Sequence, residues 1–311
     1  TGVAAGIKRV GCVGMCHQVP LVEVVPVRGE PHLYSKVRAA DVEQIVDHHF
    51  QSVNFFRRLT QRVLQGLEDF QDEDRWPGVD RYSLDIREKH VSSFLGKQIP
   101  MATEFRGIIN PLDIEEYMER DGFRGLTRAL KEKSPGQITQ EIMESGMRGR
   151  GGAGFPTGQK WKLVAAQKSD KKYVICNGDE GDPGAFMDRM LLESYPYRIL
   201  EGMIAAAYAV GASTGILYIR AEYPLAVNRI QQAIATCREH GFLGEDILGS
   251  GFDFELSVYQ GAGAFVCGEE TTLMESIEGR RGFPRVRPPF PAVKGLWGKP
   301  TLVNNTETFA Q

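Results

Sequence analysis

The fold is decided by residues 173–220, which read YVICNGDEGDPGAFMDRMLLESYPYRILEGMIAAAYAVGASTGILYIR. The apolar runs at 173–176 and 215–220 have the length of buried strands, and residues 190–209 between them have the length of a helix. A further helix is expected at 224–239 and a further strand at 254–259. Short apolar strands that alternate with helices predict an α/β sheet covered by helices on both faces.

The rest of the chain divides into three expected domains. Residues 1–50 form a small α/β segment with a strand-like run at 20–26 and a helix at 41–50. Residues 51–112 are polar and charged, and we interpret them as a connector. Residues 113–311 form the main domain, whose first helices are expected at 113–120, 125–131 and 137–145.

Composition excludes several classes of protein. The 311 residues include 37 Lys and Arg against 40 Asp and Glu, so a binder of bulk polyanions such as nucleic acid is not expected. The longest apolar stretch, 199–219, carries Glu201 and contains two glycines near its end, which indicates buried helix, turn and strand rather than a membrane span. Five scattered cysteines favour a reducing compartment.

The ends of the chain indicate a fragment. It begins at Thr1 rather than Met and ends just after a run of amide and hydroxyl residues at 304–308 that has the character of a continuing motif. No signal peptide is recognised, and the expected location is the cytoplasm.

A glycine-rich loop, SGMRGRGGAGFPTGQK at 145–160, contains a literal G-x-G-x-x-G. It follows a predicted helix rather than a strand, so it lacks the context of the Rossmann dinucleotide motif, and it has no Walker Gly-Lys-Ser/Thr. Its glycine N–H groups, with Arg148, Arg150, Lys160 and a helix N-terminus after Pro156, predict a cradle for an anion such as phosphate. A flexible connector is the alternative, but cations placed among the glycines argue against it.

Two polar segments follow predicted strands, where ligands collect in open α/β sheets. The first, NGDEGDPG at 177–184, lacks the spacing of a calcium-binding EF-hand, so its acids are better suited to hydrogen bonds with ribityl, ribose or amide groups. The second, GAGAFVCGEET at 261–271, again pairs small residues with carboxylates. An ordinary polar turn is the alternative for each segment taken alone.

Two later segments could also contact a nucleotide. The basic and aromatic loop RVRPPFP at 285–291 is suited to stacking an adenine, and residues 304–306 offer amide and hydroxyl groups. Either could be merely structural. Cys176 and Cys267 lie at apolar boundaries, and we interpret both as small core residues rather than nucleophiles.

Taken together, the motifs at 148–158, 176–180, 261–271, 288–291 and 295–305 resemble the NADH-oxidising flavoprotein subunit of respiratory complex I. Relatives of that subunit serve NAD-linked hydrogenases and formate dehydrogenases. The resemblance covers residues 113–311 and implies a Rossmann-like domain that binds FMN and NADH in one pocket. It also implies that part of a thioredoxin-like ferredoxin module precedes this domain.

The resemblance implies a set of site residues. The FMN site would contain Gly149, Arg150, Gly151, Gly152 and Lys160, completed by Asn177, Asp179, Gly268, Glu269, Asn304, Asn305 and Thr306. The NADH contacts would come from Gly154, Phe155, Glu180, Asp182, Phe265, Glu270, Arg287 and Phe290. Glu180 is the candidate catalytic residue, because it would position the nicotinamide by hydrogen bonding. The sequence departs from the family pattern at Leu163, Asp182, Phe265 and Thr306, which affects nucleotide affinity more than chemistry.

Iron–sulfur ligands are implied for the N-terminal segment. Cys12 and Cys16 resemble the second cysteine pair of a thioredoxin-like [2Fe-2S] module, which needs four ligands. The other pair is expected before Thr1, and a docking module that has lost its cluster is the alternative. The [4Fe-4S] cysteines and the ubiquitin-like domain of the family are expected beyond Gln311.

The function implied is that of a diaphorase-type electron-input subunit. It would transfer a hydride between NADH and FMN and pass electrons singly to iron–sulfur subunits of a hydrogenase, a formate dehydrogenase or a complex-I-like assembly. The chain itself would not insert into the membrane, but partner subunits could hold it at the membrane periphery. The alternatives are a non-catalytic docking subunit and a flavoprotein that uses NADPH; acidic residues at 179–182 favour NADH over NADPH.

Overall fold

The computed structural model describes residues 5–14, 19–27, 31–50 and 99–311. The chain divides into two compact units, of which unit 1 comprises residues 1–8 and 13–100 and unit 2 comprises residues 9–12 and 101–311. In unit 1, strands β1 (Val22–Val24) and β2 (His32–Tyr34) pair antiparallel, and α1 (Val42–His49) follows a short 3₁₀ turn, η2 (Ala39–Asp41). These elements agree with the strand and helix expected there. Cys16 and most of the expected connector lie outside the described residues.

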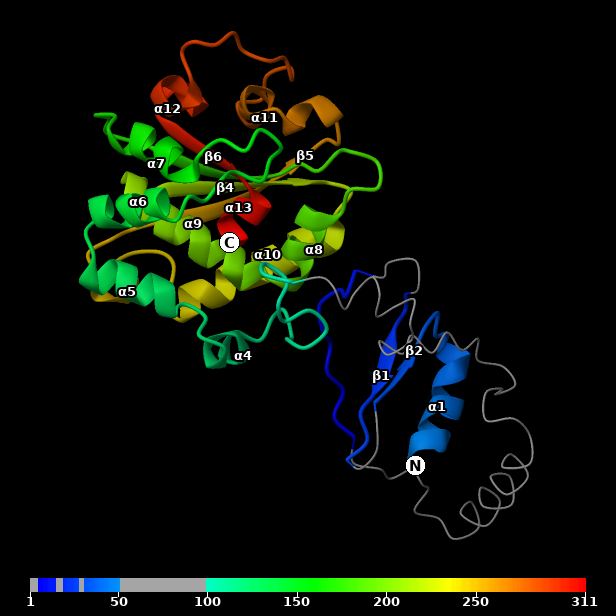
Figure 1. The fold of residues 1–311 in the computed structure, drawn as a ribbon. Helices are drawn as coiled ribbons and strands as arrows, with labels where there is room; N and C mark the ends of the chain where they lie inside the picture. The colour runs from blue at the N-terminus through cyan, green and yellow to red at the C-terminus, as the bar shows by residue number, and fades with distance from the viewer. Residues whose placement is uncertain (1–4, 15–18, 28–30, 51–98) are drawn as a thin grey trace, which may run out of the picture. The chain divides into compact units, whose positions relative to one another are not determined.

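Unit 2 contains a parallel sheet whose strands lie in the order β5-β4-β3-β6 (Figure 1). The strands are β3 (Tyr173–Gly178), β4 (Thr214–Arg220), β5 (Glu255–Gly261) and β6 (Thr301–Asn305). Strands β3 and β4 are buried almost throughout, as expected of central strands that are covered on both faces. The predicted α/β sheet is therefore confirmed.

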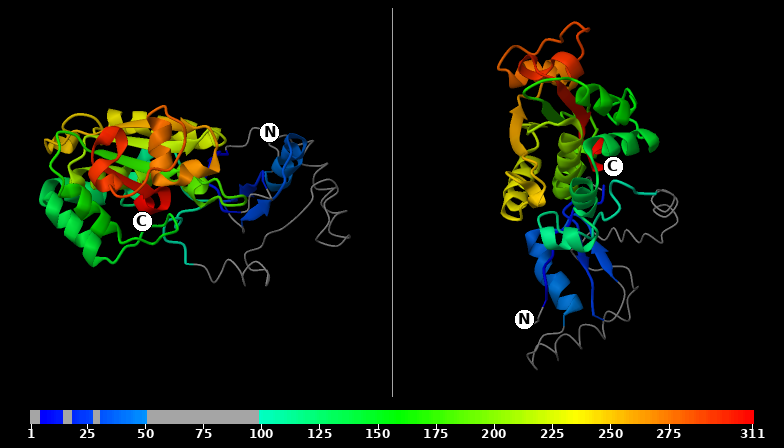
Figure 2. Two further views of the ribbon diagram at one scale, coloured as in Figure 1. Left: turned by 90° about the horizontal axis from the view of Figure 1, so that it is seen from above. Right: turned by 90° about the vertical axis from the view of Figure 1, so that its left-hand side faces the viewer.

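Helices cover both faces of this sheet (Figures 1 and 2). Helices α9 (Pro196–Val210) and α10 (Pro224–Glu239) lie on one face, and α11 (Glu270–Ile277) and α12 (Pro291–Lys294) lie on the other. The larger core packs the strands against α9 and α10, and the smaller core packs them against α11. The remaining elements of unit 2 are α4 (Ile114–Glu119), α5 (Arg124–Glu132), α6 (Pro135–Glu144), α7 (Thr157–Ala165), α8 (Met187–Ser194), η3 (Ile247–Gly249), η4 (Phe265–Gly268), η5 (Leu296–Gly298) and α13 (Thr306–Ala310).

The strand order creates a switch point. From β3 the chain moves to β4 and then β5 on one side, and it returns to the other side of β3 as β6. The carboxyl ends of β3 and β6 therefore lie side by side where the strand order reverses, which is the position where ligands bind in open α/β sheets.

Two expectations about elements were wrong. The helix expected at 190–209 is two helices, α8 and α9, because Pro196 opens α9 and its ring nitrogen cannot donate the hydrogen bond that would continue α8. Strand β6 was not predicted, because its apolar part, Leu302 and Val303, is too short to show a period.

The single acid within the longest apolar stretch has a structural role. Glu201 of α9 accepts hydrogen bonds from the backbone N–H groups of Phe123 (2.9 Å) and Leu126 (3.1 Å) at the start of α5, and from the hydroxyl of Tyr117 (2.6 Å). It thus supplies the cap that the first residues of α5 lack, since Phe123 offers no side-chain oxygen.

Candidate functional site

The glycine-rich loop is a closed hairpin. The N–H of Gly149 donates to the carbonyl of Phe155 (2.8 Å), and the N–H of Thr157 donates to the carbonyl of Met147 (2.9 Å). The tip, residues 150–154, extends beyond these two hydrogen bonds, and α7 begins directly after the hairpin. The loop is therefore an ordered turn with exposed backbone and not a flexible connector.

Side chains and glycines shape the tip of this loop. Arg148 folds back and donates from Nε to the carbonyl of Gly154 (2.7 Å), so it closes the loop internally. Gly152 and Gly154 have φ values of 102° and 61°, which side chains rarely tolerate. Of the predicted anion ligands in this loop, Arg150 is the one whose guanidinium makes no close hydrogen bond in the described structure.

The loop tip packs against the start of α13. The N–H of Arg150 donates to the hydroxyl of Thr308 (3.0 Å), and Nε of Arg150 lies 4.0 Å from the carboxylate of Glu307. A Cβ atom at Gly151 would lie 3.3 Å from Cβ of Asn305, so a larger residue would push the loop away. Segments that are far apart in the sequence thus meet at this edge of the sheet.

Strands β3 and β6 bring the next predicted residues together. Asn177 and Asn305 are partners in the parallel register, and the hydroxyl of Thr306 donates to the carbonyl of Asn177 (3.1 Å). The side-chain amide of Asn177 donates to the carbonyl of Gly268 (2.8 Å), which belongs to the segment after β5. Three polar segments that are far apart in the sequence therefore form one surface at the switch point.

Lys160 reaches this surface from α7. Its Nζ donates to the carbonyl of Val303 in β6 (2.9 Å) and lies 3.5 Å from a carboxylate oxygen of Glu270. An ammonium group has three donors, so these contacts leave one N–H for a ligand.

Two carboxylate oxygens beside the polar surface at the switch point are buried and accept no hydrogen bond in the described structure. They belong to Asp179, whose Oδ1 lies 3.4 Å from Nε of Arg220, and to Glu269, whose Oε1 lies 3.5 Å from Arg287. Burial raises the pKa of Asp179 to about 6, although Arg220 opposes the shift. Burial also acts to raise the pKa of Glu269, but hydrogen bonds from Thr271 and Thr272 outweigh it and lower that pKa. Each oxygen faces an arginine at ion-pair distance, and it retains an acceptor position that a donor of a ligand can use.

Glu180 is held by its surroundings at the end of β3. Its carboxylate accepts from the N–H groups of Asp188 and Arg189, both at 3.2 Å, and so caps α8. Its carbonyl accepts from Arg220 (2.9 Å) and from the hydroxyl of Tyr223 (3.1 Å). Sequence reasoning missed Arg220 and Tyr223; the available signal was a charged residue that ends an apolar strand.

The phenylalanines expected to contact NADH are exposed. Phe155, Phe265 and Phe290 have between 42% and 69% of their surface accessible. A Cβ atom at Gly181 would lie 3.0 Å from the ring of Phe265, so this ring covers the segment next to Glu180. Exposed aromatic rings beside a polar surface are available for stacking with a planar ligand.

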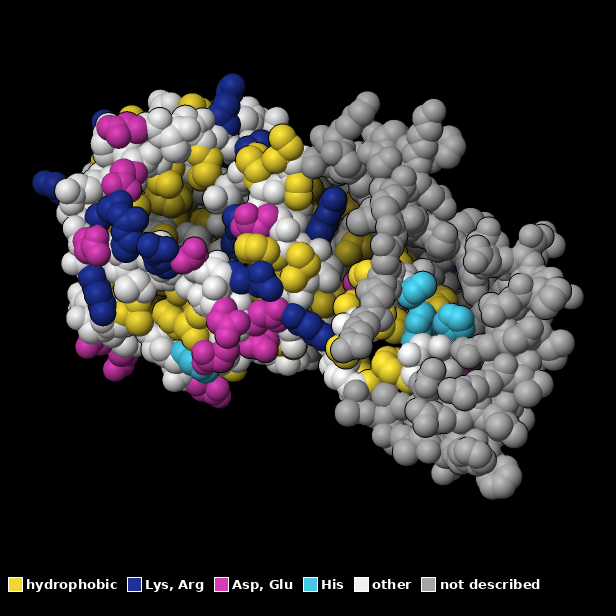
Figure 3. All heavy atoms as spheres, turned by 60° about the horizontal axis from the view of Figure 1, so that its bottom comes forward, with side chains coloured by type: hydrophobic (Ala, Val, Ile, Leu, Met, Phe, Trp, Pro, Cys, Tyr) yellow, Lys and Arg dark blue, Asp and Glu magenta, His cyan; other side chains and the backbone are white. Residues whose placement is uncertain are grey.

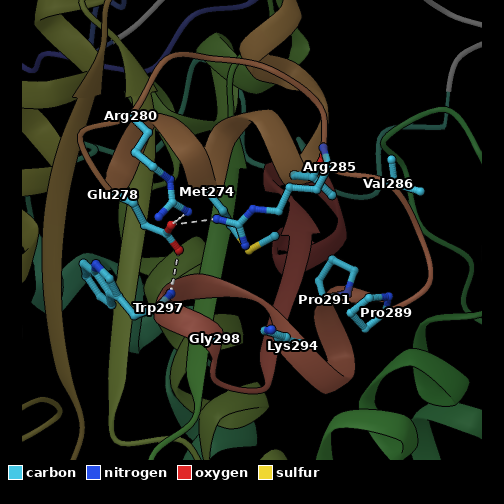
Figure 4. A pocket seen from close by; sticks show the side chains of 11 residues that line it. Met274, Glu278, Arg280, Arg285, Val286, Pro289, Pro291, Lys294, Trp297 and Gly298 are labelled. Carbon is cyan, nitrogen blue, oxygen red and sulfur yellow. Dashed lines mark hydrogen bonds and ion pairs between the residues drawn. The ribbon is translucent and has the colours of Figure 1, made fainter.

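The two arginines of the loop at 285–291 contact different parts of α11. Arg287 pairs with Glu270 at its start (2.9 Å), whereas Arg285 pairs with Glu278 just beyond its end (2.8 Å). A cavity of about 560 Å³ lies on the Arg285 side (Figure 4); it is lined by residues of α11, α12 and the loops beside them, including Met274, Glu278, Arg280, Pro289, Lys294 and Trp297. This cavity is not lined by the glycine-rich loop or by the segment after β3.

The remaining predicted residues differ in how far they are buried. Asn304 is buried, and its amide faces the indole nitrogen of Trp161, so it is directed into the protein. Asp182 is an exposed residue of the loop between β3 and α8. Cys176 and Cys267 are buried, as predicted, and burial raises the pKa of the Cys176 thiol to about 12.

The N-terminal cysteines are only partly described. The N–H of Cys12 donates to the hydroxyl of Ser194 at the end of α8 (2.9 Å), and Cys16 lies outside the described residues. Among the residues that the structure describes, no group of three or more His, Cys, Asp and Glu side chains is arranged to hold a metal ion.

The charge distribution of unit 2 and the length of its apolar helices bear on the expectations about polyanions and membranes. Acidic and basic side chains share the face of unit 2 that Figure 3 shows. Within the described ranges, no helix has both the length and the apolar character that crossing a membrane requires.

Comparison with known proteins identifies the family. The sequence profile described as "Nuo51 FMN-binding domain" matches residues 142–311, which is more than half of the chain. An NADP-reducing hydrogenase subunit, HndC of Solidesulfovibrio fructosivorans, is 53% identical over 214 residues, covering 69% of this chain and 43% of that protein. A subunit of the NADH-quinone oxidoreductase of Escherichia coli K12 is 46% identical over 210 residues, covering 67% of this chain and 47% of that protein.

A solved structure agrees with this result. An NAD⁺-reducing [NiFe]-hydrogenase in the H₂-reduced state is 31% identical, has a TM-score of 0.55, and is matched over 90% of this chain and 41% of its own. The chain thus spans less than half the length of these relatives.

Proposed function

Because the chain belongs to the Nuo51 FMN-binding domain family, we propose that it binds FMN and NADH at the switch point of its sheet and serves as the electron-input subunit of a larger redox complex. The observation that carries the proposal is the convergence of the glycine-rich loop, the Asn177–Asn305 pair and the segment after β5 on one polar surface.

The residues of this surface fit FMN. Arg150 and Lys160 retain donors for a phosphate, and the loop tip beside them carries several glycine N–H groups. The remaining acceptor positions on the Asp179 and Glu269 oxygens suit the N3–H of a flavin ring and the hydroxyls of a ribityl chain. Gly268 lets the segment after β5 pack closely on the segment after β3, because a Cβ atom there would lie 3.2 Å from the carbonyl oxygen of Asp179.

The chain would supply orientation rather than an acid, a base or a nucleophile. FMN, when bound, would accept a hydride from NADH and release electrons one at a time. Phe155, Phe265 and Phe290 would contact the dinucleotide, and Glu180, fixed by α8, Arg220 and Tyr223, would position the nicotinamide.

The rest of the assignment follows from the family. We propose residues 113–311 as the FMN- and NADH-binding domain, residues 1–50 as part of a thioredoxin-like module, and Cys12 and Cys16 as two of four [2Fe-2S] ligands. Iron–sulfur subunits would take the electrons, and a [4Fe-4S] cluster would be bound by residues after 311. Such an assembly would work in the cytoplasm, peripheral to the membrane where its partners are.

NADPH is the second candidate donor. It is favoured by one observation, the 53% identity to a relative named as a subunit of an NADP-reducing hydrogenase. The acidic residues between Asp179 and Asp182 oppose it, because they would repel a 2′-phosphate bound near them.

An anaerobic titration tests the proposal. The purified chain is supplied with FMN, its visible spectrum is recorded, and NADH or NADPH is added stoichiometrically. Bleaching of the flavin band by NADH is expected. Bleaching by NADPH alone would overturn the donor, and a folded chain that holds no flavin would favour a non-catalytic docking subunit.

Glu180→Gln should impair NADH oxidation more than FMN binding. The amide of glutamine keeps an acceptor oxygen for one N–H group of α8 but carries no charge. Losing one hydrogen bond to a charged group lowers a binding or rate constant roughly tenfold or more. We expect kcat/KM for NADH to fall at least about tenfold, and the FMN dissociation constant to change less than about threefold. Steady-state assays with an artificial acceptor and flavin fluorescence measure the two quantities.

Glu239→Gln is the control for this variant, because it makes the same charge change at the exposed end of α10. Equal activity of Glu180→Gln and the wild type would remove Glu180 from the nicotinamide site.

A further inference from the structure

Asp188 is a buried acid beside the proposed site that the family motifs do not include. It lies in the first turn of α8 with 6% of its surface exposed. Its Oδ2 accepts a hydrogen bond of 2.6 Å from Nδ2 of Asn305. Its own N–H is bound by Glu180, so its backbone and its side chain contact two different residues of the site.

The contact with Asp188 determines how the amide of Asn305 is oriented. Oδ1 of Asn305 accepts from the N–H of Glu307 (2.9 Å) and caps α13, so Nδ2 must find an acceptor elsewhere. Asp188 provides that acceptor. If the side-chain amide of Asn305 rotated by about 180°, its NH₂ group would face the N–H of Glu307, and α13 would lose its N-terminal cap.

Asn305 in turn touches the glycine-rich loop. Its Cβ would lie only 3.3 Å from a Cβ atom at position 151, so the loop and Asn305 are in close contact. The following residues of α13 include Thr308, whose hydroxyl accepts a hydrogen bond from the N–H of Arg150. The contacts therefore run from Asp188 through Asn305 and α13 to the loop tip.

We propose that Asp188 is a positioning residue of the FMN site, which orients Asn305 and thereby holds the glycine-rich loop against α13. The inference rests on the proposed function, because it assigns Asp188 a role in binding the FMN of that site.

The charges around Asp188 add a pH dependence. The groups facing it are Glu180 after β3, the Cys176 thiol on β3 and Glu307 on α13, which also lies near Arg150. On α8 itself, Arg189 pairs with Glu193, and Arg229 of α10 donates to the carbonyl of Glu193. Burial, followed by the charge of Glu180, raises the pKa of Asp188 to about 7.

The sign of this dependence follows from the raised pKa. The folded chain binds the Asp188 proton more tightly than the unfolded chain, so this group makes the fold less stable as pH rises from about 4 to about 7. Above that range a third carboxylate stands beside Glu180 and Glu307, close to the loop that would hold a phosphate. FMN affinity should therefore fall as Asp188 ionises.

The test compares three variants of the 311-residue chain, freed of flavin, by fluorescence titration with FMN at pH 6 and pH 8. Asp188→Ala removes the acceptor, and we expect its dissociation constant to rise about tenfold at pH 6. Asp188→Asn keeps an acceptor oxygen, so it should bind within about threefold of the wild type at pH 6 and lose less affinity than the wild type at pH 8. Ionisation of the FMN phosphate affects all variants equally. It therefore cancels when the dissociation constant of a variant is divided by that of the wild type at the same pH.

Glu193→Ala is the matched control, because it removes another buried acid of α8 whose carboxylate pairs with Arg189. It should leave FMN affinity unchanged. Hydrogen exchange of the flavin-free chain gives a readout without FMN: the amide of Arg150 should exchange faster in Asp188→Ala than in Glu193→Ala.

Wild-type affinity in Asp188→Ala, or equal losses in Asp188→Ala and Glu193→Ala, would overturn the positioning role. A wild-type chain that binds no FMN would instead overturn the proposed function, and this inference with it.

Discussion

The double variant Arg150→Ala, Lys160→Ala is expected to bind FMN at least about a hundredfold more weakly than the wild type while it keeps its fold. Hydrogen bonds to charged groups contribute about 1.5–3 kcal/mol each, so the loss of two cations from a phosphate site corresponds to about 3–6 kcal/mol. In the described structure Arg150 has only a distant ion pair with Glu307 (4.0 Å), and Lys160 has one strong contact, to Val303. Neither side chain is therefore essential for the fold.

Flavin fluorescence titration and circular dichroism measure the two effects. Arg128→Ala with Lys162→Ala is the matched control, because it removes one exposed Arg and one exposed Lys, the latter from the same helix as Lys160. Unchanged FMN affinity in the Arg150 and Lys160 variant would show that the phosphate lies elsewhere. Equal losses in both double variants would show that only net charge matters.

Gly202→Ala is expected to destabilise unit 2 by about 3 kcal/mol, at the upper end of the range for overpacked cores. A Cβ atom at this position of α9 would lie 2.0 Å from the carbonyl oxygen of Phe309 in α13, and backbone cannot move aside as a flexible side chain can. The helix propensity gained by replacing glycine, about 1 kcal/mol, is too small to offset this clash.

Thermal unfolding measures the cost, and a fall in Tm of roughly 6–12 °C is expected. Because α13 also carries Thr308, which binds the N–H of Arg150, FMN affinity should fall together with stability. Gly136→Ala is the control: this glycine lies in α6, where a new Cβ meets nothing within 4 Å, so stability should be equal or slightly higher. A Gly202→Ala chain that melts like the wild type would contradict the close packing of α9 on α13.

Local patterns in the sequence were sufficient for the class of fold and for a set of candidate site residues. The strands at 173–176 and 215–220 are visible as apolar runs because central parallel strands are buried on both faces. The loop at 145–160 is predicted to be an anion cradle because glycines, cations and a following helix are a local combination. The structure shows an ordered hairpin there, and the cradle stays a prediction. The family followed from motifs that each lie within about a dozen residues.

The tertiary structure decided which of these segments meet. Strand β6 has too few apolar residues to show a period, yet its register with β3 places Asn305 beside Asn177 and turns Asn304 toward Trp161. Asp188 could not be recognised from the sequence, since an acid in the first turn of a helix is ordinarily a solvent-exposed residue that favours the helix dipole. The role proposed for it depends on its hydrogen bond with Asn305, which is 117 residues away in the sequence. Local sequence specifies backbone conformation and burial, but pairing across such distances depends on strand order and helix packing, which no short segment encodes.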